Sequence, residues 1–102
     1  MPTDFNITLE DASTLTENYR NQFPPETPFI MGEMFDNSSV QRILDQEGCT
    51  SLRIYYGLKT DSTKCLILVG VDVDGNDLCD GYLTENGLGS PPFSSEANAL
   101  NS

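Results

Sequence analysis

The spacing of hydrophobic residues near the start of the chain predicts a first helix over residues 8–21. Apolar side chains recur there at the interval of one helical face, at Leu9, Ala12, Leu15 and Tyr19. Thr8 followed by Asp11 resembles a capping box, in which the Thr hydroxyl accepts a backbone hydrogen bond. Pro24 and Pro25 disfavour helical geometry in the residue before each of them, so the helix ends before this pair.

A second amphipathic pattern predicts another helix near residues 38–47. Val40, Ile43 and Leu44 supply its apolar stripe. Three residues at its start have good N-cap side chains, namely Asp36, Asn37 and Ser38. Gly48 fits a left-handed C-cap at its end.

The segment between these two helices has no single predicted structure. Residues 22–29 are typical of an extended connector because they contain several prolines. The apolar patch over residues 29–35 is interrupted by Gly32 and Glu33, and it fits either a short helix or a short strand.

Alternating side chains in the second half of the chain predict three consecutive strands. The first runs from Leu52 to Leu58, and the second, Lys64 to Asp72, is dense in Leu, Ile and Val. Asp74-Gly75 is typical of a tight hairpin with left-handed turn residues, and Leu78 to Thr84 forms the third strand. Short links between the strands favour an antiparallel meander, because parallel strands need long crossovers.

These elements together predict an α+β fold. Two short helices pack on one face of the three-stranded antiparallel meander. A chain of 102 residues has room for one domain. We expect residues 1–84 to form that domain and residues 85–102 to form an extended, Pro-rich C-terminal tail.

The predicted hairpin places apolar residues on both faces of its central strand. With Asp74-Gly75 at the tip, Val71 pairs with Leu78, and residues opposite each other share a face. One face then carries Cys65, Ile67, Val69, Val71, Leu78 and Tyr82, and the other carries Leu66, Leu68, Gly70, Cys79, Gly81 and Leu83. Two short helices cover only one side of such a sheet, so the other side needs the connector, the tail or another chain.

If another chain supplies this cover, its contacts involve exposed positions of the sheet and the Pro-Pro segment of the tail. The expected interface residues are Tyr55, Ile67, Val69, Val71, Tyr82, Pro91, Pro92 and Phe93. Pro-rich strips with an aromatic residue can dock into aromatic grooves. The alternative for Phe93 is a tail that packs back onto its own domain.

Acidic residues dominate the charge of the chain. Sixteen Asp and Glu oppose five Lys and Arg, which gives a net charge of −11. This balance argues against a partner such as nucleic acid or an anionic membrane, because both are bound through basic side chains. The absence of His removes the commonest general acid or base at neutral pH, so we do not expect an enzyme. With no bilayer-length apolar run and no secretory signal pattern, we expect a cytoplasmic protein.

The candidate metal ligands are few. Cys49, Cys65 and Cys79 are widely spaced and have no His to complete a zinc site. The oxygen-bearing side chains of Asp72, Asp74 and Asn76 resemble the start of a calcium loop. The sixth and twelfth positions of that loop should be Gly and Glu but are Asp77 and Leu83 here. A hairpin turn explains these residues without a metal, so no cofactor is expected.

Several segments resemble a group of short bacterial hypothetical proteins. The similarity lies in Glu47-Gly48-Cys49, Leu52 to Gly57, Leu66 to Asp72, Gly75-Asn76-Asp77 and Pro91-Pro92. Members of the group often carry Cys-Pro-Pro-x-Cys near the end, where this chain has Ser90-Pro91-Pro92-Phe93-Ser94. If the two cysteines bind a metal or form a disulfide in other members, this chain has lost that element. The resemblance implies no activity.

These observations favour a small acidic, non-enzymatic protein-interaction module that self-assembles or docks to a protein partner. The apolar faces of the sheet and the Pro-Pro tail are the features behind this expectation. The alternative is an acidic inhibitor or immunity-type protein that binds the basic cleft of an effector or nucleic-acid enzyme, since the net charge of −11 suits such a target. That alternative requires acidic side chains on one continuous face.

Overall fold

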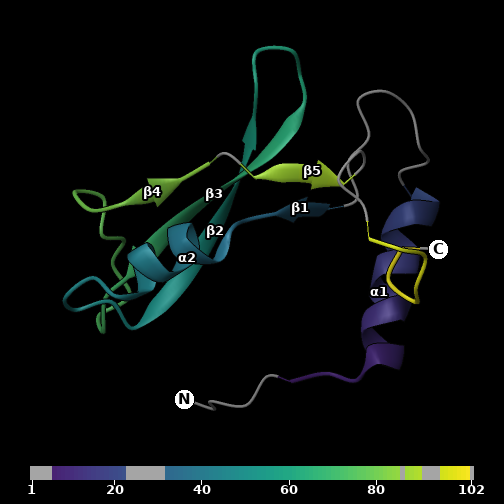
Figure 1. Ribbon diagram of the computed structural model, residues 1–102, viewed down its shortest axis with the longest axis horizontal. Helices are drawn as coiled ribbons and strands as arrows, with labels where there is room; N and C mark the ends of the chain where they lie inside the picture. The colour runs from purple at the N-terminus through teal and green to yellow at the C-terminus, as the bar shows by residue number, and fades with distance from the viewer. Residues whose placement is uncertain (1–5, 23–31, 86, 91–94, 102) are drawn as a thin grey trace.

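The computed structural model describes residues 6–22, 32–85, 87–90 and 95–101. Its elements are α1 (Leu9–Gln22), β1 (Gly32–Met34), α2 (Asn37–Leu44), β2 (Ser51–Leu58), β3 (Lys64–Val71), β4 (Leu83–Thr84) and β5 (Leu88–Ser90). Strands β2, β3 and β4 form an antiparallel sheet in that order, and β1 pairs with β5 in a second, two-stranded sheet (Figure 1). The predicted α+β class and antiparallel meander are therefore confirmed.

Both helices begin at the predicted capping residues. The N–H of Asp11 donates a hydrogen bond of 3.0 Å to Thr8 Oγ1 at the start of α1. At the start of α2, Asp36 is the N-cap and accepts a hydrogen bond of 3.1 Å from the N–H of Ser39. Helix α2 ends earlier than predicted, because Asp45, with φ of −82°, is its C-cap. Gly48 is left-handed as expected, with φ of +82°, but it lies beyond the cap.

The two helices differ in their position relative to the sheet. Helix α2 lies against the three-stranded sheet, whereas α1 stands apart from it, with the β1–β5 pair between them (Figure 1). The expected packing of two helices on one face therefore holds for α2 only. No residue of α1 is fully buried, and its large apolar residues Leu9 and Leu15 remain exposed. Because α1 has few large apolar side chains, it gains little from packing on the sheet.

The described residues after the three-stranded sheet include a strand and a C-terminal turn. Leu88–Ser90 forms β5 and pairs with β1, so the undecided patch near residue 32 contains a strand. Further along, the carbonyl of Leu100 accepts a hydrogen bond of 2.5 Å from Arg20 on α1. The C-terminal turn therefore lies beside the first helix, as Figure 1 shows. Residues 91–94 of the Pro-Pro segment lie outside the described residues.

The hairpin after β3 has a three-residue loop, and the two-residue loop predicted from Asp74-Gly75 is wrong. The N–H of Gly75 donates to the carbonyl of Asp72 at 3.0 Å, and the N–H of Asp72 donates to Asn76 at 2.9 Å. Within this loop only Gly75 has a positive φ, of +85°. This is the geometry of a type I turn followed by a left-handed residue. Val71 consequently pairs with Asp77 and not with Leu78.

A second change shortens the last strand of the meander to Leu83–Thr84. Val69 pairs with Leu83, so the residues from Cys79 to Tyr82 form an extra loop that the predicted register did not contain. Gln46 holds this loop against the end of α2. Its Oε1 accepts a hydrogen bond of 2.9 Å from the N–H of Tyr82, and its Nε2 donates to the carbonyl of Ile43 at 2.9 Å.

The core is built on both faces of β3, as the apolar pattern predicted. Gly70 lies on the α2 side, where a Cβ atom would come within 3.3 Å of Ile43 Cγ2. Leu68 shares this face and is buried with Ile43. On the opposite face Val69 and Val71 are 2% and 4% exposed. The single chain therefore buries the main apolar residues on both sides of its central strand.

Candidate functional site

The most accessible part of the sheet is its outer strand, β2. Among the described residues β2 pairs with β3 along its whole length and has no strand on its other side. It spans eight residues, from Ser51 to Leu58, in a continuous antiparallel register. An unpaired edge of this length presents a row of backbone N–H and C=O groups that can accept another strand.

The register shows which backbone groups of β2 face away from β3. The N–H of Lys59 donates to the carbonyl of Thr63 at 2.8 Å, so these residues form a hydrogen-bonded pair that continues the ladder. Hydrogen-bonded and non-hydrogen-bonded pairs alternate along an antiparallel ladder. The backbone N–H and C=O groups of Arg53, Tyr55 and Gly57 therefore also point toward β3. The outward backbone groups belong to Leu52, Ile54, Tyr56 and Leu58, which we call the β2 edge.

The β2 edge carries large side chains, of which Leu52 is half-buried and the other three are exposed. Tyr56 is 91% exposed, Leu58 68% and Ile54 48%. They lie on the same face of the sheet as Leu68 and Gly70, the face against which α2 packs. Helix α2 therefore covers the central strand but leaves the apolar side chains of the outer strand accessible.

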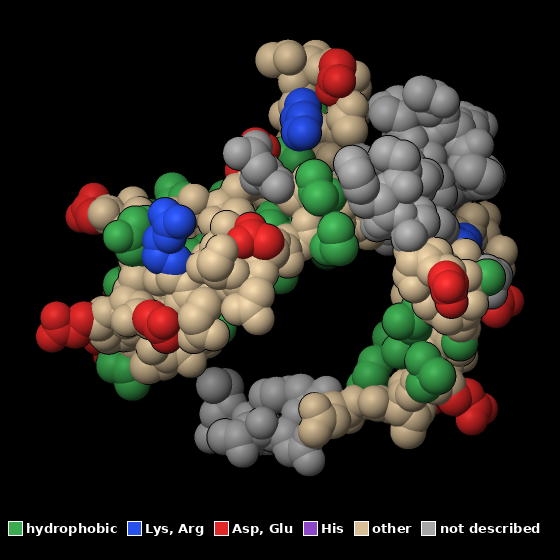
Figure 2. All heavy atoms as spheres, in the orientation of Figure 1, with side chains coloured by type: hydrophobic (Ala, Val, Ile, Leu, Met, Phe, Trp, Pro, Cys, Tyr) green, Lys and Arg blue, Asp and Glu red, His purple; other side chains and the backbone are tan. Residues whose placement is uncertain are grey.

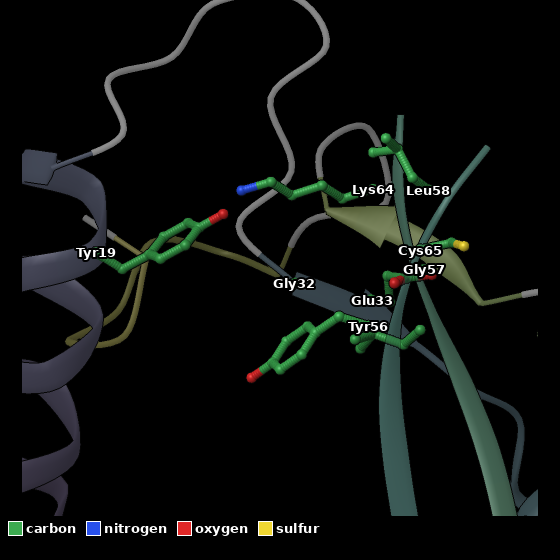
Figure 3. A pocket seen from close by; sticks show the side chains of 9 residues that line it. Tyr19, Gly32, Glu33, Tyr56, Gly57, Leu58, Lys64 and Cys65 are labelled. Carbon is green, nitrogen blue, oxygen red and sulfur yellow. The ribbon is translucent and has the colours of Figure 1, made fainter. Parts of the chain in front are cut away.

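A cavity of about 560 Å³ adjoins the end of the β2 edge. Tyr56 and Leu58 line it together with residues of α1, β1 and β3. Figure 3 shows Tyr19 from α1 and Lys64 from β3 extending toward each other across this space. The Lys64 Nζ atom lies 5.7 Å from the centre of the Tyr19 ring, within the range of a cation–π contact. The cavity therefore lies between α1 and the exposed end of the sheet, and it continues the apolar surface of the β2 edge.

Two carboxylates lie near this cavity. Burial raises the pKa of Glu33, which lines the cavity, and the nearby charge of Glu85 raises it further, whereas Lys59 acts in the opposite direction. One carboxylate oxygen of Glu85, Oε2, is buried without a hydrogen-bond partner among the described residues. Two neighbouring carboxylates in partly buried positions disfavour further negative charge, so an acidic ligand is a poor match for this end of the surface.

The opposite face of β2 carries a polar cluster of Arg53, Tyr55 and Asp77. Arg53 Nη1 and the Tyr55 hydroxyl each lie 2.5 Å from an oxygen of the Asp77 carboxylate. These contacts, the Tyr55 hydrogen bond first, lower the pKa of Asp77, and the same hydrogen bond raises the pKa of Tyr55. Arg53 also donates to the carbonyl of Gly75 at 3.3 Å. The cluster ties the hairpin loop to the middle of β2.

The structure separates the residues expected at an interface into three groups. Tyr55 and Tyr82 are exposed, and Arg42 lies 5.0 Å from the centre of the Tyr82 ring. Val69 and Val71 are buried and Ile67 is half-buried, so the valines do not contribute to an accessible surface. Both valines lie on the central strand, where each has a pairing partner on either side. Pro91, Pro92 and Phe93 lie outside the described residues.

The interface residues predicted from the sequence did not include Ile54, Tyr56 and Leu58. Their alternation marked β2 as a strand, but it did not show that β2 lies at the edge of the sheet. Gln46 was also missed, because its role depends on Tyr82, which is distant in the sequence.

The candidate calcium ligands take part in a turn. Oδ1 of Asp72 accepts hydrogen bonds of 2.9 Å from the N–H groups of Asp74 and Asn76. These bonds explain why Asp begins this loop. Within the described ranges, no three His, Cys, Asp or Glu residues form a group that could hold a metal ion.

The acidic side chains are distributed over several elements. On the face in Figure 2 they appear at separate places around the molecule and do not gather into one continuous patch. In the same part of the chain that the structure describes, no helix is long and apolar enough to cross a membrane. No protein-family model matches this chain, and no curated protein or solved structure is significantly similar to it.

Proposed function

We propose that this protein is a non-enzymatic interaction module that accepts an extended protein segment on the β2 edge. The observation behind the proposal is the combination of outward backbone groups and exposed large side chains on one eight-residue strand. An added strand gains affinity from main-chain hydrogen bonds and specificity from its alternate side chains. The β2 edge offers both kinds of contact.

The described residues of β2 include none of the side chains that commonly prevent strand addition. Natural edge strands are often protected by proline, by lysine or by a charged residue that points inward. The sequence of β2 contains no proline, no lysine and no acidic residue, and its single charge, on Arg53, is paired with Asp77. The edge is therefore suited to contact with another strand.

The partner in this proposal is a protein in the cytoplasm, and neither nucleic acid nor a membrane surface takes part. The net charge of −11 disfavours both of those surfaces. The acidic-inhibitor alternative needs a continuous acidic face, and the face shown in Figure 2 does not provide one. We therefore retain the strand-accepting module as the single proposed function.

Nuclear magnetic resonance with a synthetic strand tests this proposal. A ten-residue peptide of alternating valine and lysine is added to the isotope-labelled full chain. We expect the largest amide changes at the β2 edge and smaller changes at Arg53 and Tyr55, whose N–H groups bond to β3.

The matched control is the same peptide with proline at every second position, because proline cannot donate to a ladder. Equal shifts with both peptides, or shifts concentrated away from β2, would contradict the proposal. An unchanged spectrum of a chain that remains monomeric would also contradict it.

A further inference from the structure

We infer that the strand accepted by the β2 edge is β2 of a second copy of this chain, paired antiparallel about a twofold axis at Tyr55. This inference rests on the proposed function and adds the identity of the partner. The product is one continuous sheet in which β2 of each copy becomes a central strand.

Backbone geometry restricts how two β2 strands can pair. In a symmetric antiparallel pair, outward N–H and C=O groups must face outward groups of the other copy. Centring the pair on Tyr55 places Ile54 opposite Tyr56 of the second copy. The same register places Leu52 opposite Leu58 of the second copy, so every residue of the β2 edge exchanges hydrogen bonds.

The side chains in this register are complementary on both faces. On the α2 side, Ile54 meets Tyr56 of the second copy, and pairs of a β-branched and an aromatic residue are favourable. On the other side, the long side chain of Arg53 lies opposite Gly57 of the second copy, which has no side chain to oppose it. Tyr55 lies opposite its own equivalent on the axis.

Neighbouring symmetric registers are less favourable. Centring the pair on Arg53 places two guanidinium groups opposite each other, and centring it on Tyr56 places Arg53 opposite Lys59 of the second copy. Like charges directly opposite each other destabilise a strand pair. Centring the pair on Ile54 places Leu58 opposite Thr50 of the second copy. Thr50 lies outside β2, so the outward N–H and C=O groups of Leu58 lose their partners.

The local charge of β2 also permits contact between two copies of a strongly acidic chain. The strand contains no Asp or Glu, although the whole chain has sixteen. Self-pairing along β2 therefore avoids direct carboxylate–carboxylate contacts at the centre of the interface. The remaining repulsion acts over longer distances and is weakened by salt, so dimerisation should strengthen as ionic strength rises.

Sedimentation and light scattering of the full chain test the inference. At about 100 µM we expect a species of twice the chain mass of 11.2 kDa. Tyr56→Pro removes an outward donor but no β3 hydrogen bond, and it should weaken dimerisation about 100-fold. Tyr55→Lys places like charges on the axis and should also produce monomers. The matched control Val73→Lys changes an exposed apolar residue of the hairpin loop and should leave the dimer intact.

Nuclear Overhauser contacts in a sample mixed from labelled and unlabelled copies identify the register. The inference requires a contact between the Tyr55 Hα atoms of the two copies. A monomeric wild-type chain that binds the valine–lysine peptide at the β2 edge would overturn the self-pairing and leave the proposed function intact. A dimer that dissociates equally in Val73→Lys, or that remains intact in Tyr55→Lys with its circular dichroism unchanged, would also overturn it.

Discussion

Replacement of Gly81 by alanine should destabilise the protein through a single neighbouring side chain. A Cβ atom at position 81 would lie 1.8 Å from Oε1 of Gln46 and 2.9 Å from its Cδ. The Gln46 side chain must therefore move away. Its hydrogen bonds to the Tyr82 N–H and to the Ile43 carbonyl are then lost.

The expected cost follows from these two bonds. A typical protein hydrogen bond contributes about 1 kcal/mol to stability, so their loss amounts to roughly 2 kcal/mol. Alanine also restricts the unfolded chain relative to glycine, which returns about 0.4–1 kcal/mol. We therefore expect Gly81→Ala to lower the free energy of unfolding by about 1–2 kcal/mol, measured by urea denaturation and circular dichroism.

A double-mutant cycle tests the cause. Gln46→Ala alone removes the same two hydrogen bonds, and adding Gly81→Ala in that background should be neutral or slightly stabilising, because no clash remains. If the two losses simply add in the double variant, the contact between Gly81 and Gln46 is not the source of the effect. Amide exchange at Tyr82 gives a second measurement, because both single variants should accelerate it.

Two further predictions concern the turns and the acid stability of the fold. Gly75 has a φ of +85° and Ser62 a φ of +70°. Gly75→Ala should therefore lower the free energy of unfolding by about 1–2 kcal/mol, whereas Ser62→Gly should not lower it. Urea midpoints of the two variants test this difference, and equal losses of stability would contradict it. Hydrogen bonds from Ser38 and Ser39 lower the pKa of Asp36 from 3.8 to about 2, so its stabilising effect is present above pH 3.8 and is lost as the pH falls toward 2. Asp36→Asn should flatten the decline of the urea midpoint between pH 4 and pH 2, and an unchanged pH profile would contradict this role.

The capping residues and the strands could be predicted because they depend on neighbours in the sequence. Thr8 and Asp36 bond to N–H groups only three residues away, and the alternation in β2 and β3 reflects the two faces of a strand. The three-residue loop was missed because Asp74-Gly75 is compatible with two turn types. The choice between them moved the pairing partner of Val71 from Leu78 to Asp77.

The candidate site could be predicted only in part. The sequence favoured an interaction surface on an apolar sheet, and it included Tyr55. It also included Val69 and Val71, which are buried on the central strand of the sheet, with β2 on one side and β4 and the hairpin return on the other. The β2 edge was missed because alternation alone does not distinguish an outer strand from a central one.

The sequence by itself determined the α+β class, the helix starts, the left-handed Gly48 and Gly75 and the apolar character of both faces of β3. These features follow from local hydrogen bonding and from the period of side-chain direction. Only the tertiary structure decided that α1 stands apart, that Gln46 holds the loop before β4 and that β2 is the open edge. Those features depend on which distant segments meet, because an edge exists only where no other strand completes the ladder.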